Sequence, residues 1–470
     1  MLLERLTSGE GLDVANPATG DVIGSVRAYS RGEVEGLIAK ADAARGEWAE
    51  LTAKERSAIL AGWFDLVMAR QDDLAAIVTA ECGKPLAEAR GEVAYGASFI
   101  QWFAEEAKRA YGETIPAFAR GKRLLTIRQP IGNCAAITPW NFPIAMITRK
   151  AAPALAAGCT MLVKPAEATP LSALALETLA HEAGVPRDVF RVVPTMDPSG
   201  VGELFCESPL IRKLSFTGST RVGKLLMAQA AATVTKVSLE LGGNAPFIVF
   251  DDADLDQAVE GAIASKFRNA GQTCVCANRI LVQDGVHDEF VARLVGKVAS
   301  FTIGDGALPG TEIGPLIHAD AVGKVAKLVA DAVDAGASVV VGGQRSSAGA
   351  NFYAPTVLTG VTAQMAITAS EIFGPVAPVI RFQDEAEAIR IANDTPYGLA
   401  AYFYARDMGR IWRVMEELEY GMVGVNDGII STEVAPFGGI KESGIGREGS
   451  RHGLDEYLEL KYCLMGGIDR

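Results

Sequence analysis

The sequence predicts an α/β protein built from two parallel-sheet domains in series, because its length and its hydrophobic pattern agree. The chain has 470 residues, 49% of them apolar, which is too long for one compact unit and enough for a large core. Short apolar runs alternate with helical stretches twice, over 124–241 and over 246–426. Strands alternating with helices form parallel sheets that are buried on both faces. We expect ligands in the crevice between the two units and at the carboxyl ends of the strands.

The individual elements follow from the spacing of the apolar residues. The first hundred residues are predicted to be helical, with helices at 31–51, 54–70 and 74–89. The first alternating set has predicted strands at 134–138, 160–164, 189–193, 213–216 and 236–241, and helices at 145–157, 170–184 and 221–232. The second has predicted strands at 246–250, 279–283, 338–341, 376–382, 400–404 and 422–425, and helices at 254–265, 288–300 and 384–392. The tail, 455–465, alternates as a strand does, and its lack of local partners suggests docking elsewhere, on another subunit.

Composition excludes several classes of protein. The net charge is −13 and no block of Lys and Arg occurs, so no nucleic-acid partner is expected, and anionic ligands must meet local cations. No uncharged apolar run of about 18 residues is present, so we expect no membrane span. Residues 1–10 lack the apolar core of a signal peptide. Seven scattered cysteines argue against a disulfide framework and favour a cytoplasmic location. We expect no metal site.

The segment 267–276 carries the most informative side chain, the thiol of Cys274 on a Gly-Gln-Thr turn. A structural cysteine usually lies among core hydrophobes, whereas a cysteine on such a turn can reach a substrate, and its thiolate attacks carbon. Arg268 adds a cation six positions earlier, and Cys276 adds a second thiol two positions later. This segment alone supports a reactive and a structural Cys274 equally.

Two segments are candidates for nucleotide binding. Residues 216–223 follow a predicted strand and begin a helix, so their free N–H groups can bind a phosphate, although Ser219 or Thr220 would also serve as an ordinary N-cap. Lys164 and Glu167 follow another strand and can bracket a ribose, although a surface ion pair explains them better in isolation. A G-x-G-x-x-G pattern at 444–449 follows no hydrophobic strand and is interpreted as a turn.

Two further side chains are suited to acid–base and oxyanion chemistry. Asn141 lies between Pro139 and Pro143, and that rigidity suits an amide aimed at a developing oxyanion; a structural turn is equally consistent. Glu240 is a carboxyl group in an apolar strand that ends in glycines. A buried carboxyl needs a partner or a raised pKa, so Glu240 is either a general base or part of a core salt bridge.

Taken together, these segments resemble the NAD(P)-dependent aldehyde dehydrogenase superfamily, and 371–375 and 436–444 agree with it as well. The match covers nearly the whole chain in the family's order. It implies the aldehyde dehydrogenase fold: a Rossmann-like cofactor domain (1–117 and 133–242), a catalytic domain (243–437) and a β oligomerisation arm (118–132 and 455–470). The family forms homodimers and homotetramers, so one of these is expected. A catalytically silent protein on the same fold is disfavoured because Cys274, Glu240 and Asn141 are all retained.

The resemblance also implies roles for single residues. Cys274 would be the nucleophile, Glu240 the general base, and Asn141 the oxyanion donor together with the Cys274 N–H. The cofactor contacts implied are Thr138, Pro139, Trp140, Lys164, Glu167, Gly218, Ser219, Gly223, Leu241, Glu371 and Phe373. The thiolate would add to the aldehyde, hydride would leave, and water activated by Glu240 would hydrolyse the thioester. A free thiol titrates near about 8.5, so a lowered pKa is expected at Cys274.

Within the superfamily, residues 142–150, 267–276 and 428–431 are most similar to succinate-semialdehyde dehydrogenases. This implies that Arg149, Arg268 and Ser431 bind the distal carboxylate of the aldehyde; the alternative is that each arginine pairs with a nearby acid. Glutarate semialdehyde, one methylene longer, and a broad aldehyde specificity remain open.

The same comparison of residues bears on the cofactor and on redox control. NAD is expected over NADP, because the Glu167 carboxylate would repel a 2′-phosphate. Some relatives with this Cys-x-Cys spacing form a reversible disulfide, so Cys276 is a possible redox partner of Cys274. A small side chain packed under the loop is the favoured interpretation of Cys276.

Overall fold

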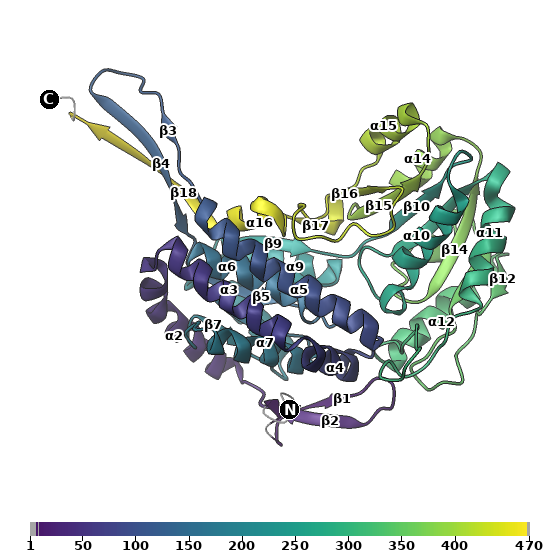
Figure 1. Cartoon of the computed structure of the whole chain (residues 1–470), viewed down its shortest axis with the longest axis horizontal. Helices are drawn as coiled ribbons and strands as arrows, with labels where there is room; N and C mark the ends of the chain where they lie inside the picture. Colours follow the sequence, from purple (N-terminus) through teal and green to yellow (C-terminus); the bar gives the residue numbers. More distant parts are fainter. Residues whose placement is uncertain (1–5, 8, 468–470) are drawn as a thin grey trace.

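The computed structural model describes residues 6–7 and 9–467, which form two α/β lobes with a β arm projecting from the first lobe (Figure 1). The predictions for the first ten residues therefore fall partly outside the described residues, as do residues 468–470 of the predicted arm. A two-stranded hairpin, β1 (Leu12–Ala15) and β2 (Val22–Val26), was not predicted. It precedes the helices of the first lobe.

Four helices begin the first lobe: α2 (Arg31–Glu50), α3 (Ala53–Ala69), α4 (Gln71–Cys82) and α5 (Leu86–Glu106), which runs into the short η1 (Ala107–Arg109). Capping boxes start α2 at Ser30 and α3 at Thr52. The single helix predicted over 74–89 is wrong, because the chain breaks between α4 and α5. Gly83 ends α4 with a left-handed φ of 84°, and Pro85 then occupies the N-cap position of α5.

The first sheet has the strand order β17-β9-β8-β5-β6-β7, and only β17 is antiparallel to its neighbour. Its strands are β5 (Asn133–Ile137), β6 (Thr160–Lys164), β7 (Phe190–Val192), β8 (Ile211–Thr217), β9 (Lys236–Glu240) and β17 (Gly444–Ile445). The helices between them are α6 (Ala145–Ala157), α7 (Pro170–Glu182), α8 (Pro198–Glu207) and α9 (Thr220–Ala230). Because β5 pairs with both β6 and β8, the strand order reverses there and opens a crevice at the carboxyl ends of β5 and β8.

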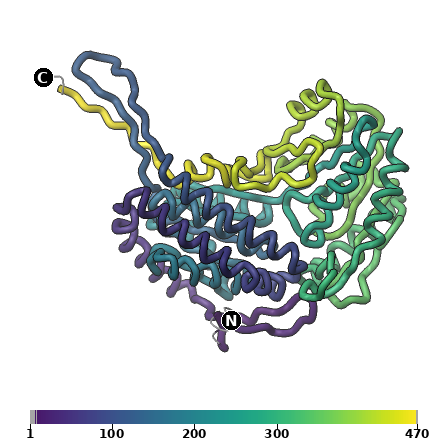
Figure 2. The backbone as a smooth tube through the Cα atoms, viewed as in Figure 1, coloured from purple at the N-terminus to yellow at the C-terminus, as the bar shows by residue number. Residues whose placement is uncertain are grey.

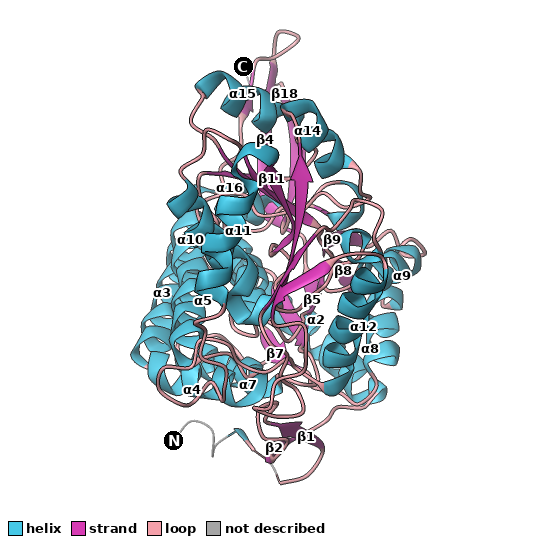
Figure 3. Cartoon of the chain, turned by 90° about the vertical axis from the view of Figure 1, so that its right-hand side faces the viewer, coloured by secondary structure: helices cyan, strands magenta, loops and turns pink. Residues whose placement is uncertain are grey.

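The second sheet has the order β12-β13-β14-β11-β10-β15-β16 and is parallel except at β12. Its strands are β10 (Ala245–Val249), β11 (Ala277–Gln283), β12 (Ser338–Val341), β13 (Thr356–Thr359), β14 (Val376–Phe382), β15 (Ala400–Tyr404) and β16 (Met422–Val425). Its helices are α10 (Leu255–Phe267), α11 (Asp284–Val298), α12 (Ala319–Asp334), α13 (Ala366–Ala369), α14 (Glu385–Asn393) and α15 (Met408–Glu417). Helices flank the strands (Figure 3), as expected for buried parallel sheets. The fold-class prediction is confirmed, although β13, α8, α12 and α15 were not predicted.

The arm is a three-stranded antiparallel sheet of β3 (Thr114–Ile115), β4 (Lys122–Pro130) and β18 (Leu458–Gly466). Before reaching it, the chain returns from the second lobe through η3 (Lys441–Ser443), β17 and α16 (Ser450–Asp455). The predicted C-terminal strand exists, and as expected it docks far from its sequence neighbours: it pairs along its whole length with β4 of the same chain, and not with another subunit. Figure 2 shows these two segments, far apart in sequence, lying side by side.

We predict that Gly83→Ala destabilises the protein. A Cβ at Gly83 would lie 2.6 Å from Pro315 Cγ in the second lobe, and the residue has a left-handed φ. The strain and the overlap together should lower the free energy of unfolding by about 2–4 kcal/mol. Denaturant titration measures this change. Gly36→Ala, at an exposed helical position with no atom within 4 Å of the new Cβ, should be neutral or stabilising. Equal stability of the two variants would contradict the argument.

Candidate active site

A cavity of about 510 Å³ opens where two loops of the first sheet diverge. Pro139, Trp140 and Asn141 follow β5, whereas Gly218 and Ser219 follow β8. These strands are the adjacent pair at which the strand order reverses, so their loops turn away from each other. The sequence therefore places the crevice correctly on this lobe.

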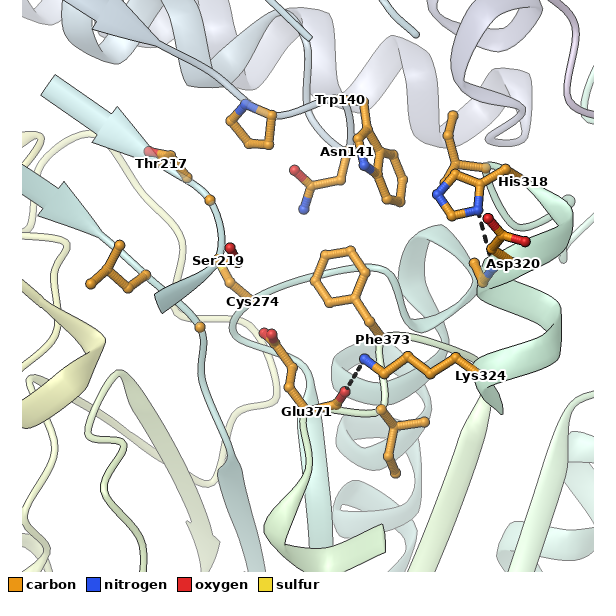
Figure 4. A pocket seen from close by; sticks show the side chains of 17 residues that line it. Trp140, Asn141, Thr217, Ser219, Cys274, His318, Asp320, Lys324, Glu371 and Phe373 are labelled. Carbon is orange, nitrogen blue, oxygen red and sulfur yellow. Dashed lines mark hydrogen bonds between the residues drawn. The ribbon is translucent and has the colours of Figure 1, made fainter. Parts of the chain in front are cut away.

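The second lobe contributes residues that precede its strands. Gly242 lies just before β10, Cys274 just before β11, and Glu371 and Phe373 just before β14, and all four line the cavity. The site therefore uses the carboxyl edge of the first sheet and the amino edge of the second. The expectation of ligands at strand carboxyl ends is wrong for the second lobe. Figure 4 shows Asn141 and Trp140 on one side of the cavity and Glu371 and Phe373 on the other.

An unusual backbone turn carries Cys274. Asn269, Ala270 and Gly271 have φ values of 51°, 52° and 77°, three left-handed residues in succession. Such a conformation costs a non-glycine residue roughly 1–2 kcal/mol. Gly271 is also required by space, because a Cβ there would lie 2.2 Å from the Gly374 carbonyl oxygen. The loop is therefore held by its surroundings and not by its local preference.

Hydrogen bonds tie this loop to Asn141. The Asn141 side-chain amide donates to the Gln272 carbonyl oxygen at 3.0 Å, and the Asn269 side-chain amide donates to the Asn141 carbonyl oxygen at 3.0 Å. Lys84 also donates to that carbonyl, at 2.8 Å, while its ammonium forms a buried ion pair with Glu92. One N–H of the Asn141 amide is thus used within the protein, and the other is available to a ligand.

The Cys274 thiol is half-buried. Burial raises its pKa to about 12, although the positive charge of Arg149 acts to lower it. The negative charges of Glu371 and Glu240 raise it further. The expected lowering of this pKa is therefore wrong for the protein alone. The thiol needs a nearby proton acceptor before it can attack a carbonyl carbon.

Glu240, at the end of β9, is 3% exposed, and burial raises the pKa of its carboxyl well above the usual value. The charge of Glu448 adds to this, whereas Arg149 and Lys150 oppose it. Among the described residues, Glu240 Oε2 has no hydrogen-bond partner. The charge of Glu240 acts on the Cys274 thiol, and a carboxyl with a raised pKa is a stronger base than an ordinary one, which suits it to proton transfer.

Sequence reasoning missed Glu448, which lies in the 444–449 segment interpreted as a turn. Glu448 forms a buried ion pair with Arg149 and accepts a 2.6 Å hydrogen bond from Lys150 Nζ. Lys150 also donates to Thr217 Oγ1 at 2.5 Å. A lysine in an apolar helix must find a partner when buried, so Lys150 was a signal that a distant acid existed.

A second cavity, of about 260 Å³, adjoins the same loops and contains two of the three predicted carboxylate-binding residues. Arg268 and Ser431 line it together with Tyr95 and Phe142. Arg149 is not among its lining residues; it is fully buried, and its Nε pairs with Glu448, so its role in carboxylate binding stays a prediction. The Arg268 guanidinium lies over the Phe142 ring, 5.4 Å from its centroid.

Most of the predicted cofactor contacts meet in the large cavity. Those lining it are Pro139, Trp140, Gly218, Ser219, Leu241, Glu371 and Phe373. Thr138, Lys164, Glu167 and Gly223 lie outside its lining. Other lining residues were not predicted, including His318 and Lys324 near and on α12.

The chemistry of this lining fits a dinucleotide. Ser219 caps α9, its Oγ accepting from Val222 N at 3.4 Å, so the positive end of that helix faces the cavity. The rings of Trp140 and Phe373 meet edge to face at 5.7 Å. Burial raises the pKa of Glu371 to about 7, against a hydrogen bond donated by Gly243 N.

Cys276 is buried, and its thiol donates to the Lys266 carbonyl oxygen at 3.5 Å. Burial raises the pKa of Cys276, against the charge of Lys266. Both Cys274 and Cys276 are free thiols here, so the role of Cys276 as a redox partner stays a prediction.

A nucleotide-type crevice facing a thiol-bearing loop is the arrangement of a cofactor-dependent α/β oxidoreductase. The chain belongs to the aldehyde dehydrogenase family, whose model matches residues 5–463.

Three relatives define the similarity further. The succinate-semialdehyde dehydrogenase [NADP(+)] of Escherichia coli (strain K12) is 61% identical over 98% of this chain and 95% of its own length. A glutarate-semialdehyde dehydrogenase of Pseudomonas aeruginosa is 59% identical over the same shares. The crystal structure of succinate-semialdehyde dehydrogenase from Burkholderia pseudomallei superposes with a TM-score of 0.96 at 58% identity, covering 97% of this chain and 94% of that one.

The predicted preference for NAD over NADP is contradicted by the E. coli relative, which is named for NADP(+). The prediction assumed that a free Glu167 carboxylate would repel a 2′-phosphate. In the structure Glu167 forms an ion pair with the buried Lys164. Because Lys164 compensates that charge, Glu167 does not exclude NADP.

No helix among the described residues is long and apolar enough to cross a membrane. Nor do they contain a group of three or more His, Cys, Asp or Glu side chains placed to hold a metal ion.

We predict that Lys84→Met impairs both stability and turnover. Glu92 would remain buried without its cation, lowering the free energy of unfolding by about 3–5 kcal/mol. Asn141 would lose one of the donors that hold its carbonyl, so kcat should fall more than KM rises. Denaturant titration and steady-state kinetics measure the two effects.

A double variant separates them. Ile144 N donates a 2.8 Å hydrogen bond to Glu92 Oε1. Lys84→Met combined with Glu92→Gln removes both charges but keeps a side-chain oxygen that can accept this hydrogen bond. It should recover much of the stability while kcat stays low. Full recovery of kcat would show that Lys84 does not position Asn141.

Proposed function

We propose that the protein oxidises an aldehyde bearing a distal carboxylate, succinate semialdehyde first, to the dicarboxylic acid, with reduction of a nicotinamide dinucleotide. The observation that carries this proposal is the cavity lined by Arg268 and Ser431 next to the Cys274 loop. A guanidinium and a hydroxyl suit a carboxylate, and they supply local positive charge in a chain of net charge −13. The names of the E. coli and Burkholderia relatives support the substrate.

In this mechanism the Cys274 thiolate forms a bond to the aldehyde carbon, and the oxyanion accepts hydrogen bonds from the Asn141 amide and the Cys274 N–H. Glu240, with its raised carboxyl pKa, is the proton acceptor. A nicotinamide dinucleotide held in the 510 Å³ cavity would accept the hydride that leaves the carbon bonded to Cys274, and loss of that hydride converts the adduct on Cys274 to a thioester. Water activated by Glu240 then cleaves the thioester and regenerates the thiol.

The same proposal assigns a role to each domain of the chain. Residues 1–117 and 133–242 hold the cofactor, 243–437 carry the thiol, and 118–132 with 455–470 form the arm. This assignment is supported by the lining of the 510 Å³ cavity, which includes the loops after β5 and β8 of the first sheet, and by the position of Cys274 just before β11 of the second sheet. A glutarate-semialdehyde dehydrogenase is the second candidate, favoured by the Pseudomonas aeruginosa relative. The cytoplasmic location stays a prediction.

We predict that Arg268→Ala lowers kcat/KM for succinate semialdehyde about a hundredfold, because a charge-assisted contact to the carboxylate is lost. Butanal, which has the same chain length without the carboxylate, should change little. Reduced-cofactor formation with NAD and with NADP, over a panel of neutral and ω-carboxy aldehydes, measures both. The matched control is Arg390→Ala, which removes a surface arginine on α14. If Arg268→Ala keeps its preference for carboxylated aldehydes, the pocket assignment is wrong.

We also propose that the arm joins subunits into a homo-oligomer. Leu460, Tyr462 and Leu464 are 63%, 55% and 47% exposed. They alternate along β18 and so share one face. A continuous exposed apolar stripe of this kind marks a protein–protein contact.

Tyr462→Asp should therefore reduce the mass measured by light scattering after size exclusion, since it puts a charge into the stripe. Lys461→Asp, on the opposite face of β18, should leave the mass unchanged. A wild-type protein that is already monomeric would end the proposal.

A further inference from the structure

The side chain of Tyr95 is an unexplained feature of the Arg268 cavity. Tyr95 is on α5, packs against Phe142 and Met146, and meets Phe99 edge to face with ring centroids 5.0 Å apart. It is one of the residues lining the 260 Å³ cavity. Its hydroxyl oxygen is buried and has no hydrogen-bond partner among the residues described.

An unsatisfied buried hydroxyl is costly. Leaving such a group without a partner costs about 1–3 kcal/mol, and a buried tyrosine hydroxyl usually finds one. A phenylalanine would fill the same space between Phe142 and Phe99 without that cost. The packing therefore explains the ring of Tyr95 but not its oxygen, which indicates a partner that comes from outside the chain.

The surroundings of the hydroxyl show what charge that partner has. The positive charges of Arg149 and Arg268 both act on it, and the side chains of Arg149 and Ser431 approach it closely enough to lower its pKa by weak hydrogen bonding. Burial raises the pKa of Tyr95, so the hydroxyl stays protonated at neutral pH and can donate. Arg149 Nη2 is a second buried donor with no hydrogen-bond partner within the described part of the chain. Unused donors beside two guanidinium groups fit an anion.

Two carboxyl groups also line this cavity, but neither leaves a free negative charge facing Tyr95. Glu92 is paired with Lys84. Burial raises the pKa of Glu88, although Lys84 and a 2.8 Å hydrogen bond from Asn269 N oppose this shift. The local field at Tyr95 is therefore set by the two arginines.

We propose that the Tyr95 hydroxyl donates a hydrogen bond to the distal carboxylate of the substrate and, with Arg268 and Ser431, sets the preference for anionic over neutral aldehydes. This deepens the proposed function and rests on it. Tyr95 acts here as a specificity residue: it contacts the end of the substrate opposite the aldehyde and takes no part in the bond changes at Cys274.

The decisive variant is Tyr95→Phe, which removes the oxygen and keeps the ring. It should lower kcat/KM for succinate semialdehyde by about ten- to a hundredfold, mainly through KM. For butanal, kcat/KM should stay within about twofold of wild type. An equal loss for both substrates would show a packing role only, and no loss for either would also overturn the proposal.

A binding measurement provides a readout that does not depend on turnover. Calorimetric titration of the whole enzyme with succinate, the dicarboxylate product, should show weaker binding to Tyr95→Phe by a similar factor. Tyr353→Phe, at a buried tyrosine in the second lobe, is the matched control and should bind succinate as wild type does. Unchanged succinate binding by Tyr95→Phe would overturn the proposal even if its activity were low.

Arg268→Ala tells the two proposals apart. If Arg268→Ala keeps the preference for carboxylated substrates, the proposed function itself is wrong about this cavity. If Arg268→Ala loses the preference and Tyr95→Phe retains it in full, the cavity is correctly assigned and only the inference on Tyr95 fails.

Discussion

A pair of hydrogen bonds across the junction of the two lobes holds the proposed nucleophile, Cys274, and the proposed oxyanion donor, Asn141, together. Asn141 follows a strand of the first sheet and Cys274 precedes a strand of the second, and among the described residues no strand pairing connects those sheets. The Asn141 amide donates to Gln272, and the Asn269 amide donates back to the Asn141 carbonyl, both at 3.0 Å. A misplacement of about 1 Å between reacting groups can cost a hundredfold in rate, so chemistry at Cys274 depends on this junction.

Burial is the second constraint on the site, and it explains its acid–base character. Arg149, Lys150, Glu240 and Glu448 form a group of two cations and two carboxyls, and the charges of Arg149 and Glu240 act on the proposed nucleophile, Cys274. Each would be costly to bury alone, and their mutual pairing offsets that cost. Glu448 takes both cations as direct partners, which leaves Glu240 Oε2 without one and the pKa of that carboxyl raised. The network thus keeps one carboxyl able to exchange a proton.

Local patterns predicted much of this, and contacts between distant segments account for the rest. Cys274 and Asn141 stand in short motifs, and the alternating strands and helices predict both parallel sheets. The sequence Gly83-Lys84-Pro85 does signal a helix break, but the apolar residues continue at helical spacing across it, which favoured one continuous helix over 74–89. Glu448 lies 298 positions from Lys150, and single-sequence spacing carries no information about such a pair. Glu167 misled for a different reason: its partner Lys164 is only three positions away, and the prediction of NAD treated the Glu167 carboxylate as if it were unpaired.

The same two segments of the chain line both cavities, and this bears on substrate length. Asn141 lines the large cavity and its neighbour Phe142 the small one; Cys274 lines the large cavity and Arg268 the small one. The span from carboxylate to aldehyde is therefore set by two short segments of backbone. One of them contains three left-handed residues, and a Cβ at Gly271 would strike Gly374, so that segment cannot relax freely. A methylene more or less is worth only about 1–3 kcal/mol in an apolar pocket. Rigid segments that carry both the arginine and the thiol can discriminate more strongly between aldehydes of different length. A substrate of the wrong length leaves either the arginine or the thiol without its partner.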